Sequence, residues 1–172
     1  MPRPSITWII SDTHFHHNAM VTLCGRPPDF TARTIRNMRH VLAAQDILIH
    51  LGDVILYQYP TLKEILDSIP CTKVLVMGNH DRKPAGWYMR HGFAYAADMI
   101  VRGEVMFSHA PVDVLPAGVT LNVHGHLHNT GRVPPPLPRG ERRLFCLENE
   151  GYGPVKLQSF LANCGEDGRC LT

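Results

Sequence analysis

The sequence predicts an α/β fold in which two layers of mixed β-sheet form a sandwich flanked by helices. In the first half of the chain, short apolar runs of strand length alternate with amphipathic helical segments, which is typical of parallel βαβ units. In the second half, strand-like runs come close together and begin with an apparent hairpin, which favours some antiparallel pairing. A third observation is that most of these runs stop at a short polar signature.

Three runs in the first half, residues 6–10, 47–49 and 73–77, are rich in β-branched and other apolar side chains. We expect them to form buried parallel strands. Residues 31–44 and 60–68 carry apolar side chains at helical spacing, and Thr31 is a candidate cap for the first of these two segments. The segment 31–44 is expected to be an amphipathic helix that covers the sheet.

The second half predicts a hairpin of residues 99–101 and 104–107 around Arg102-Gly103, strands at 119–123 and 143–147, and a closing helix at 155–162. Four prolines within residues 133–139 exclude a central strand or helix there and indicate an extended surface loop. No repeat or linker divides the chain. We therefore expect a single domain over residues 1–162 and a flexible tail at 163–172.

Composition leaves the partner of this chain open. Its 172 residues are 44% hydrophobic and 19% charged, and 17 Lys and Arg against 15 Asp and Glu give a net charge of only +2. The five cysteines form no CxxC pair, which favours a reducing, cytoplasmic location. No signal peptide and no run of about 20 apolar residues is present, so we expect no membrane association.

Five polar signatures follow strand-like runs, so their side chains are expected at the carboxyl ends of neighbouring strands, where open sheets place their sites. Any one of them alone is more typical of a turn or a satisfied polar group than of a ligand. Their joint occurrence in this order favours a shared site. The signatures are Asp12-Thr13-His14, Gly52-Asp53, Gly78-Asn79-His80-Asp81, Ser108-His109-Ala110-Pro111 and Gly125-His126-Leu127-His128.

This ordered set resembles the calcineurin-like metallophosphoesterase superfamily, and specifically its short, uncapped bacterial and phage-type members. The resemblance spans residues 12–128, most of the chain. It implies the calcineurin-like fold with a dinuclear metal site at the strand ends. It also implies that Asp12, His14 and His128 hold one metal, that Asn79, His109 and His126 hold the other, and that Asp53 bridges them.

The resemblance implies hydrolysis of a phosphate ester, with a phosphodiester as the first expectation, by attack of a hydroxide that bridges two metal ions. Imidazole, carboxylate and amide oxygen ligands favour transition metals over calcium or magnesium. We expect two divalent ions, with manganese first and iron, zinc or nickel as alternatives. The expected partner is a small phosphate ester or a nucleotide, and no obligate protein partner is evident.

His80 matches the family histidine that contacts the scissile phosphate and assists the leaving oxygen. The protein Ser/Thr phosphatases of this family orient that histidine with an aspartate three residues after the bridging one, where this chain has Leu56. Asp81 is therefore a candidate orienting residue. His17 and Asn18 follow His14 in the same loop and are candidate contacts for the substrate phosphate.

Three alternatives stay open. A phosphomonoesterase acting on a nucleotide, sugar or protein phosphate would use the same residues. A nuclease or nucleic-acid end-processing enzyme would use the arginines as an anionic-ligand rim, although a solvated basic face explains them as well. A non-catalytic metal-binding scaffold is a further possibility, because some members of the superfamily bind protein partners. The arginines concerned are Arg26, Arg132, Arg139, Arg142 and Arg143.

Overall fold

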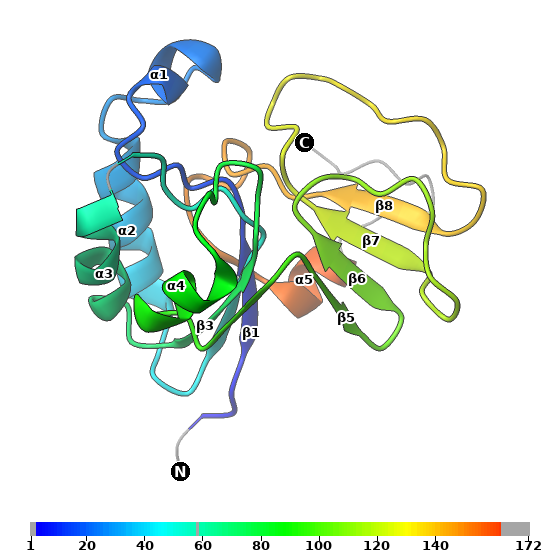
Figure 1. The fold of residues 1–172 in the computed structure, drawn as a ribbon, viewed down its shortest axis with the longest axis horizontal. Helices are drawn as coiled ribbons and strands as arrows, with labels where there is room; N and C mark the ends of the chain where they lie inside the picture. Colours follow the sequence, from blue (N-terminus) through cyan, green and yellow to red (C-terminus); the bar gives the residue numbers. More distant parts are fainter. Residues whose placement is uncertain (1–2, 58, 163–172) are drawn as a thin grey trace.

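Two β-sheets that face each other form the centre of the molecule (Figure 1). In a computed structural model that describes residues 3–57 and 59–162, the first sheet has five strands in the order β4-β3-β2-β1-β9. Strands β1 to β4 are parallel, and β9 runs antiparallel to β1. These strands are β1 (Thr7–Ile10), β2 (Ile47–His50), β3 (Thr72–Val76), β4 (Tyr95–Ala97) and β9 (Val155–Lys156).

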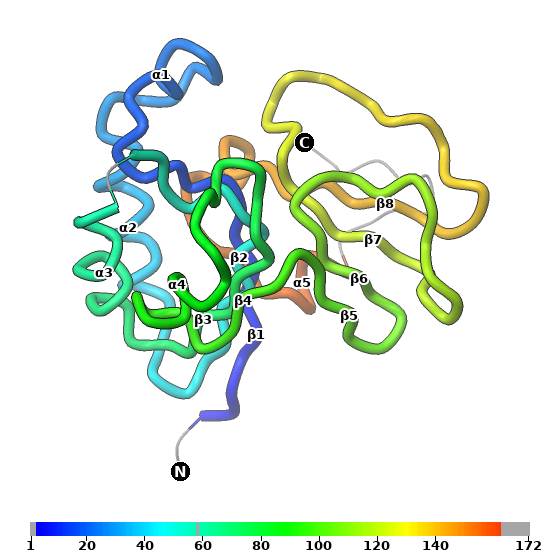
Figure 2. The backbone as a smooth tube through the Cα atoms, in the orientation of Figure 1, coloured from blue at the N-terminus to red at the C-terminus, as the bar shows by residue number. Residues whose placement is uncertain are grey.

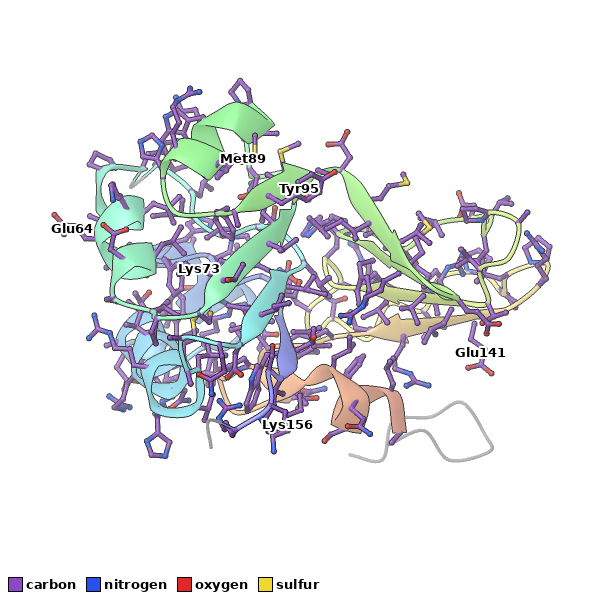
Figure 3. The ribbon with its side chains drawn as sticks, turned by 90° about the horizontal axis from the view of Figure 1, so that it is seen from below. Glu64, Lys73, Met89, Tyr95, Glu141 and Lys156 are labelled. Carbon is purple, nitrogen blue, oxygen red and sulfur yellow. The ribbon has the colours of Figure 1, made fainter. Side chains whose placement is uncertain are left out.

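The second sheet has the order β5-β6-β7-β8. Strands β5 and β6 form an antiparallel hairpin, and β6, β7 and β8 are parallel to one another. Seen from below, this sheet extends away from the first one, with Glu141 of β8 towards its far end (Figure 3). Its strands are β5 (Met99–Arg102), β6 (Val105–Ser108), β7 (Leu121–His124) and β8 (Glu141–Leu144).

Helices flank this sandwich. Helices α2 and α3 lie on the side of the first sheet that is turned away from the second sheet (Figure 1). Apolar side chains of both sheets, among them Trp8, Phe107 and Val123, belong to one buried cluster. Among the residues described, no helix has the length and apolar character needed to cross a bilayer. The helices are α1 (Ala19–Leu23), α2 (Phe30–Val41), α3 (Tyr59–Asp67), α4 (Ala85–Arg90) and α5 (Leu157–Ala162).

The predicted fold class is confirmed, and so are the hairpin and the absence of helix or strand in the proline-rich segment, which the trace shows as a long loop (Figure 2). Strand β4 was missed because its two alanines have little β-propensity. The closing helix is two residues shorter than predicted, since Val155 and Lys156 pair with β1. The single-domain assignment stays a prediction, and the tail at 163–172 lies outside the described residues.

The predicted cap of α2 is wrong. Asp29 occupies the N-cap position, without a capping side-chain hydrogen bond, and Thr31 lies inside the helix. The Thr31 hydroxyl instead accepts a hydrogen bond of 2.9 Å from the backbone N–H of His16. Thr31 thus fastens α2 to the loop that follows β1.

Candidate metal centre

Strand register brings the polar loops to one edge of the first sheet. Ile10 of β1 is paired with His50 of β2, and His50 is paired with Leu75 of β3. The loops that follow these three strands therefore begin at the same edge of the sheet. Beyond the strands, the N–H of Asp12 donates to the carbonyl of Gly52, and the N–H of His14 donates to that of Asp53, both at 2.9 Å. The first two signatures therefore lie side by side.

The loop of the second sheet joins them at the same edge. The N–H of Gly125 donates to the carbonyl of His109 at 2.9 Å, and the N–H of His126 donates to Oδ2 of Asp12 at 3.0 Å. The N–H of His80 donates to Oδ1 of Asp53, so the third signature lies at this edge as well, and the structure brings the five signatures together.

The ligand candidates have a strained backbone. Most of them adopt positive φ, a region that costs roughly 1–2 kcal/mol per non-glycine residue. Strain of this kind persists only where the surrounding structure enforces it, and it concentrates at functional sites. The candidates with positive φ are Asp12, His14, Asp53, His126 and His128.

Two positions in the signatures must be glycine because atoms of a neighbouring loop lie too close to leave room for a Cβ. A Cβ at Gly125 would lie 1.9 Å from Oγ of Ser11 and 2.3 Å from Oδ2 of Asp12. A Cβ at Gly78 would lie 2.3 Å from Oδ1 and 2.6 Å from the backbone nitrogen of Asp53. No side chain fits between these loops, so the glycines allow the carboxylates and imidazoles to converge.

One group of side chains that could hold a metal ion consists of Asp12, His14 and His128, whose ligand atoms lie within 4.8 Å of one another. Oδ1 of Asp12 is buried without a hydrogen-bond partner and lies 3.5 Å from Nε2 of His128. A buried carboxylate oxygen without a donor is costly unless a cation neutralises it. This group therefore fits a divalent metal.

A second group consists of Asp53, His109 and His126, again within 4.8 Å. Nε2 of His109 lies 2.9 Å from Oδ1 of Asn79, 3.1 Å from Nδ1 of His126 and 3.3 Å from Oδ2 of Asp53. Three acceptor atoms thus surround one ring nitrogen. These nitrogen and oxygen atoms together form a donor set that suits a divalent metal ion.

Asp53 lies between the two groups. Its Oδ2 is 3.5 Å from Nε2 of His14 in the first group and 3.3 Å from Nε2 of His109 in the second. Its Oδ1 accepts a hydrogen bond of 2.8 Å from the backbone N–H of His80. One carboxylate therefore faces both groups.

His80 lies at the edge of this arrangement. Its Nε2 is 4.0 Å from Oδ2 of Asp53, its ring packs edge-on against His14 at 5.4 Å, and its side chain is 33% exposed. It can therefore reach both the centre and a solvent-borne ligand.

The predicted contact between Asp81 and His80 is not formed, and the orienting role of Asp81 is wrong. Oδ2 of Asp81 accepts hydrogen bonds from the N–H groups of Asp53 and Gly78, and Oδ1 accepts one from Val54. Nδ1 of His80 is buried without a hydrogen-bond partner. Asp81 instead fastens the loop after β2 to the loop after β3.

The two predicted substrate contacts differ in their placement. The ring of His17 lies 5.6 Å from that of His14, and its Nδ1 is buried without a hydrogen-bond partner. Asn18 is exposed at the N-cap position of α1, and its side chain makes no capping hydrogen bond. His17 therefore borders the centre, and both substrate roles stay predictions.

Three residues near the centre were not assigned to it from sequence. Oγ of Ser11 donates to Oδ2 of Asp12 at 2.5 Å. Arg26 and Glu148 form a buried ion pair beside His128. Ser11 is adjacent to a signature and could have been considered, whereas no sequence pattern links Glu148 to His128.

The electrostatics of the two groups differ. Burial lowers the pKa of His14 to about 2, so its imidazole is neutral and ready to bind a cation. Burial also disfavours a charged His109, but the hydrogen bond that its ring donates to Asp53 and the charge of Asp12 outweigh this effect and raise the pKa of His109 to about 9. In the absence of a metal, the second group thus binds a proton.

Comparisons with known proteins agree with this geometry. The family model for the calcineurin-like phosphoesterase matches residues 7–159, a range that includes all seven ligand candidates. An uncharacterized protein of Methanocaldococcus jannaschii is 28% identical over 163 residues, covering 87% of this chain and 86% of that protein.

Two solved structures are similar to this chain. A protein of unknown function from Aquifex aeolicus has a TM-score of 0.73 at 24% identity, covering 92% of this chain and 98% of that chain, and so has the same fold. The nuclease MPE of Pseudomonas putida has a TM-score of 0.49 at 23% identity, covering 71% of this chain and 61% of that chain.

Gly78→Ala should weaken manganese binding by about tenfold or more, because the new methyl group must displace the carboxylate of Asp53, which faces both ligand groups. Gly86→Ala is the matched control, since its Cβ would meet only Nη1 of Arg90 at 3.5 Å. Calorimetric titration of both variants with manganese measures the effect. Equal affinities in the two variants would contradict the close-approach argument.

Manganese binding at pH 7.5 should release about one proton from His109, because the metal must replace the proton that this ring holds below pH 9. Affinity should therefore rise about tenfold per pH unit from pH 7 to 8.5. In the metal-free protein, the stability contributed by His109 is complete below pH 6.5 and is lost as the pH rises through 9. Titrations in buffers of different ionisation enthalpy count the protons, and a pH-independent affinity would contradict this prediction.

Proposed function

Because the chain belongs to the calcineurin-like phosphoesterase family, we propose that it hydrolyses phosphodiesters at a dinuclear metal site. The observation that carries this proposal is the position of Asp53, whose Oδ2 lies within 3.5 Å of an imidazole nitrogen from each of two ligand groups. In this proposal Asp53 bridges the two ions. Asp12, His14 and His128 hold one of them, and Asn79, His109 and His126 hold the other.

The donor chemistry supports two divalent transition metals, with manganese first and iron, zinc or nickel as alternatives. When bound, such a pair lowers the pKa of a coordinated water and neutralises charge on the phosphoryl oxygens. The protein's own contribution is rigidity. Its ligands are held by the strand ends and by hydrogen bonds between the loops, so the site needs little rearrangement to bind a substrate.

His80 is the proposed catalytic residue. Its backbone is fixed by Oδ1 of Asp53 at 2.8 Å, and its imidazole lies beside the centre while remaining one-third exposed. In this position the imidazole can donate a hydrogen bond to the phosphate and a proton to the departing alcohol oxygen. Asp81 supports this arrangement indirectly, since it holds the loops that carry Asp53 and His80.

The preference for a diester is supported by the groove beside the second ligand group. This groove of about 440 Å³ is lined by Asn79, His109 and His126 together with Asp98 and Pro111, and no lysine or arginine is among its lining residues. A phosphodiester carries one negative charge, whereas a monoester at neutral pH carries nearly two. A groove without a cationic side chain and with Asp98 in its wall favours the less charged substrate.

The nuclease alternative loses part of the observation that suggested it. Arg26 is paired with Glu148, and three of the other arginines donate to backbone carbonyls of their own chain. Arg26 and Arg143 are buried, whereas Arg132 and Arg139 are exposed, so fewer side chains are free to form a phosphate-binding rim than the sequence predicted. The three arginines are Arg139, bound to Leu115 and Pro116, Arg142, bound to Val112 and Pro135, and Arg143, bound to Phe160 and Leu161.

A small phosphodiester or a cyclic nucleotide is the proposed substrate, and no nucleic acid is required. We place the protein in the cytoplasm. Cys24, Cys71 and Cys146 are buried and unpaired, which supports a reducing compartment.

Comparison of bis-nitrophenyl phosphate with mono-nitrophenyl phosphate tests the substrate class. The manganese-loaded protein should hydrolyse the diester with a kcat/KM at least about tenfold higher, because the groove has no lysine or arginine to pair with the second charge of the monoester. A higher kcat/KM for the monoester would favour the phosphomonoesterase. Hydrolysis of neither substrate by a protein that binds metal would favour the scaffold.

His80→Gln should lower kcat by about 10²- to 10⁴-fold, since it removes the proposed proton donor. The manganese stoichiometry should be unchanged, because the His80 side chain belongs to neither ligand group. His40→Gln, an exposed position on α2, is the matched control and should keep full activity. Undiminished turnover of His80→Gln would remove His80 from the mechanism.

A further inference from the structure

A buried ion pair lies behind the first ligand group. Nη2 of Arg26 is 2.7 Å from Oε1 of Glu148, and the side chains of both residues are at most 5% exposed. Oε2 of Glu148 accepts a hydrogen bond of 3.2 Å from Sγ of Cys146. Both carboxylate oxygens are therefore engaged inside the protein, and the orientation of this carboxylate is fixed.

Arg26 fixes Glu148 relative to the first signature. Its Nη2 donates to the carbonyl of Asp12 at 2.8 Å, and its Nη1 donates to that of Thr13 at 3.2 Å. Arg26 thereby joins the loop after β1 to the segment after β8. The planar guanidinium, with several donors in fixed directions, is suited to this task.

His128 lies between this ion pair and the first ligand group. Its Nδ1 is 3.2 Å from Oε1 of Glu148, and its Nε2 is 3.5 Å from Oδ1 of Asp12. An imidazole that donates a proton from Nδ1 has its lone pair on Nε2, the nitrogen that faces the ligand group. Carboxylates in this position fix the ring, the tautomer and the basicity of metal-binding histidines.

Cys24, His128 and Glu148 also lie close enough to form a separate metal site. The guanidinium of Arg26 already occupies this place, since its Nε and Nη2 are 2.8 and 2.7 Å from Oε1 of Glu148 and its Nη2 is 3.4 Å from Nδ1 of His128. A second cation among these atoms would meet the full repulsion of a buried positive charge. The cluster therefore acts on the metal centre rather than binding an ion of its own.

We propose that Glu148, held by Arg26, is a positioning residue that keeps His128 in the Nδ1-protonated tautomer and directs its Nε2 at the first metal. This proposal rests on the proposed dinuclear site. It adds two residues that lie outside the five signatures to the machinery of that site. Glu148 touches neither the substrate nor the metal, so its effect must pass through His128.

The tautomer of His128 can be measured directly by ¹⁵N NMR of the metal-free protein labelled at histidine. In the neutral form of the wild-type ring, the proton of His128 should lie on Nδ1, and Glu148→Gln should shift the ring towards the other tautomer. Glu150→Gln is the matched control, because Glu150 is an exposed carboxylate two residues further on. An Nε2-protonated ring in the wild type would overturn the proposal whether or not the variants fold.

A metal titration then separates positioning from general support of the fold. Glu148→Gln should weaken manganese binding about 10- to 100-fold at one of the two positions and leave the other unchanged. In a His128→Ala background the same substitution should have no further effect, because the residue through which it acts is absent. Equal losses in both backgrounds would show a structural role and overturn the proposal.

The same titration distinguishes failure of the proposed role of Glu148 from failure of the proposed function. A wild-type protein that binds two manganese ions, with Glu148→Gln identical to it, contradicts only the role of Glu148. A wild-type protein that binds no metal contradicts the dinuclear site itself.

Discussion

The carboxylate of Asp53 is the interaction on which the rest of the site depends. It lies at the end of a central strand, with imidazoles of two ligand groups within 3.5 Å of the same oxygen. The other oxygen is hydrogen-bonded to the backbone of His80. A single negative charge thus orders both groups and the proposed catalytic loop, and its removal would separate them.

Holding that carboxylate in place imposes constraints on its surroundings. Glycines are required where the loop after β3 meets Asp53 and where the loop after β7 meets Asp12, since a methyl group would lie within 2.3 Å of each carboxylate. Several ligands adopt left-handed backbone conformations that are unfavourable for their residue types. The sheets, Asp81 and the pair of Arg26 and Glu148 hold these loops from behind, through hydrogen bonds to backbone groups.

Much of this could be predicted from the sequence, because the information is local. A strand such as β2 ends directly before Gly52-Asp53, so the placement of the carboxylate follows from hydrophobic patterning and from the rule for strand ends. Contacts between residues far apart in the sequence were harder to predict. The two residues of β9 are too few for a periodic signal, and Arg26 contacts Glu148 across 122 positions of the chain. Asp81 was assigned to its neighbour His80, whereas its carboxylate turns back to the backbone of Asp53 and Val54.

The most direct test of the dinuclear hydrolase is the manganese content of the protein and its hydrolysis of bis-nitrophenyl phosphate, measured on wild type and Asp53→Asn in parallel. Asparagine keeps the shape of the side chain and the acceptor for the His80 N–H but removes the charge that both ligand groups share. The account predicts two metals and turnover in the wild type, with loss of at least one metal and of activity in the variant. Two metals and full activity in Asp53→Asn would contradict it.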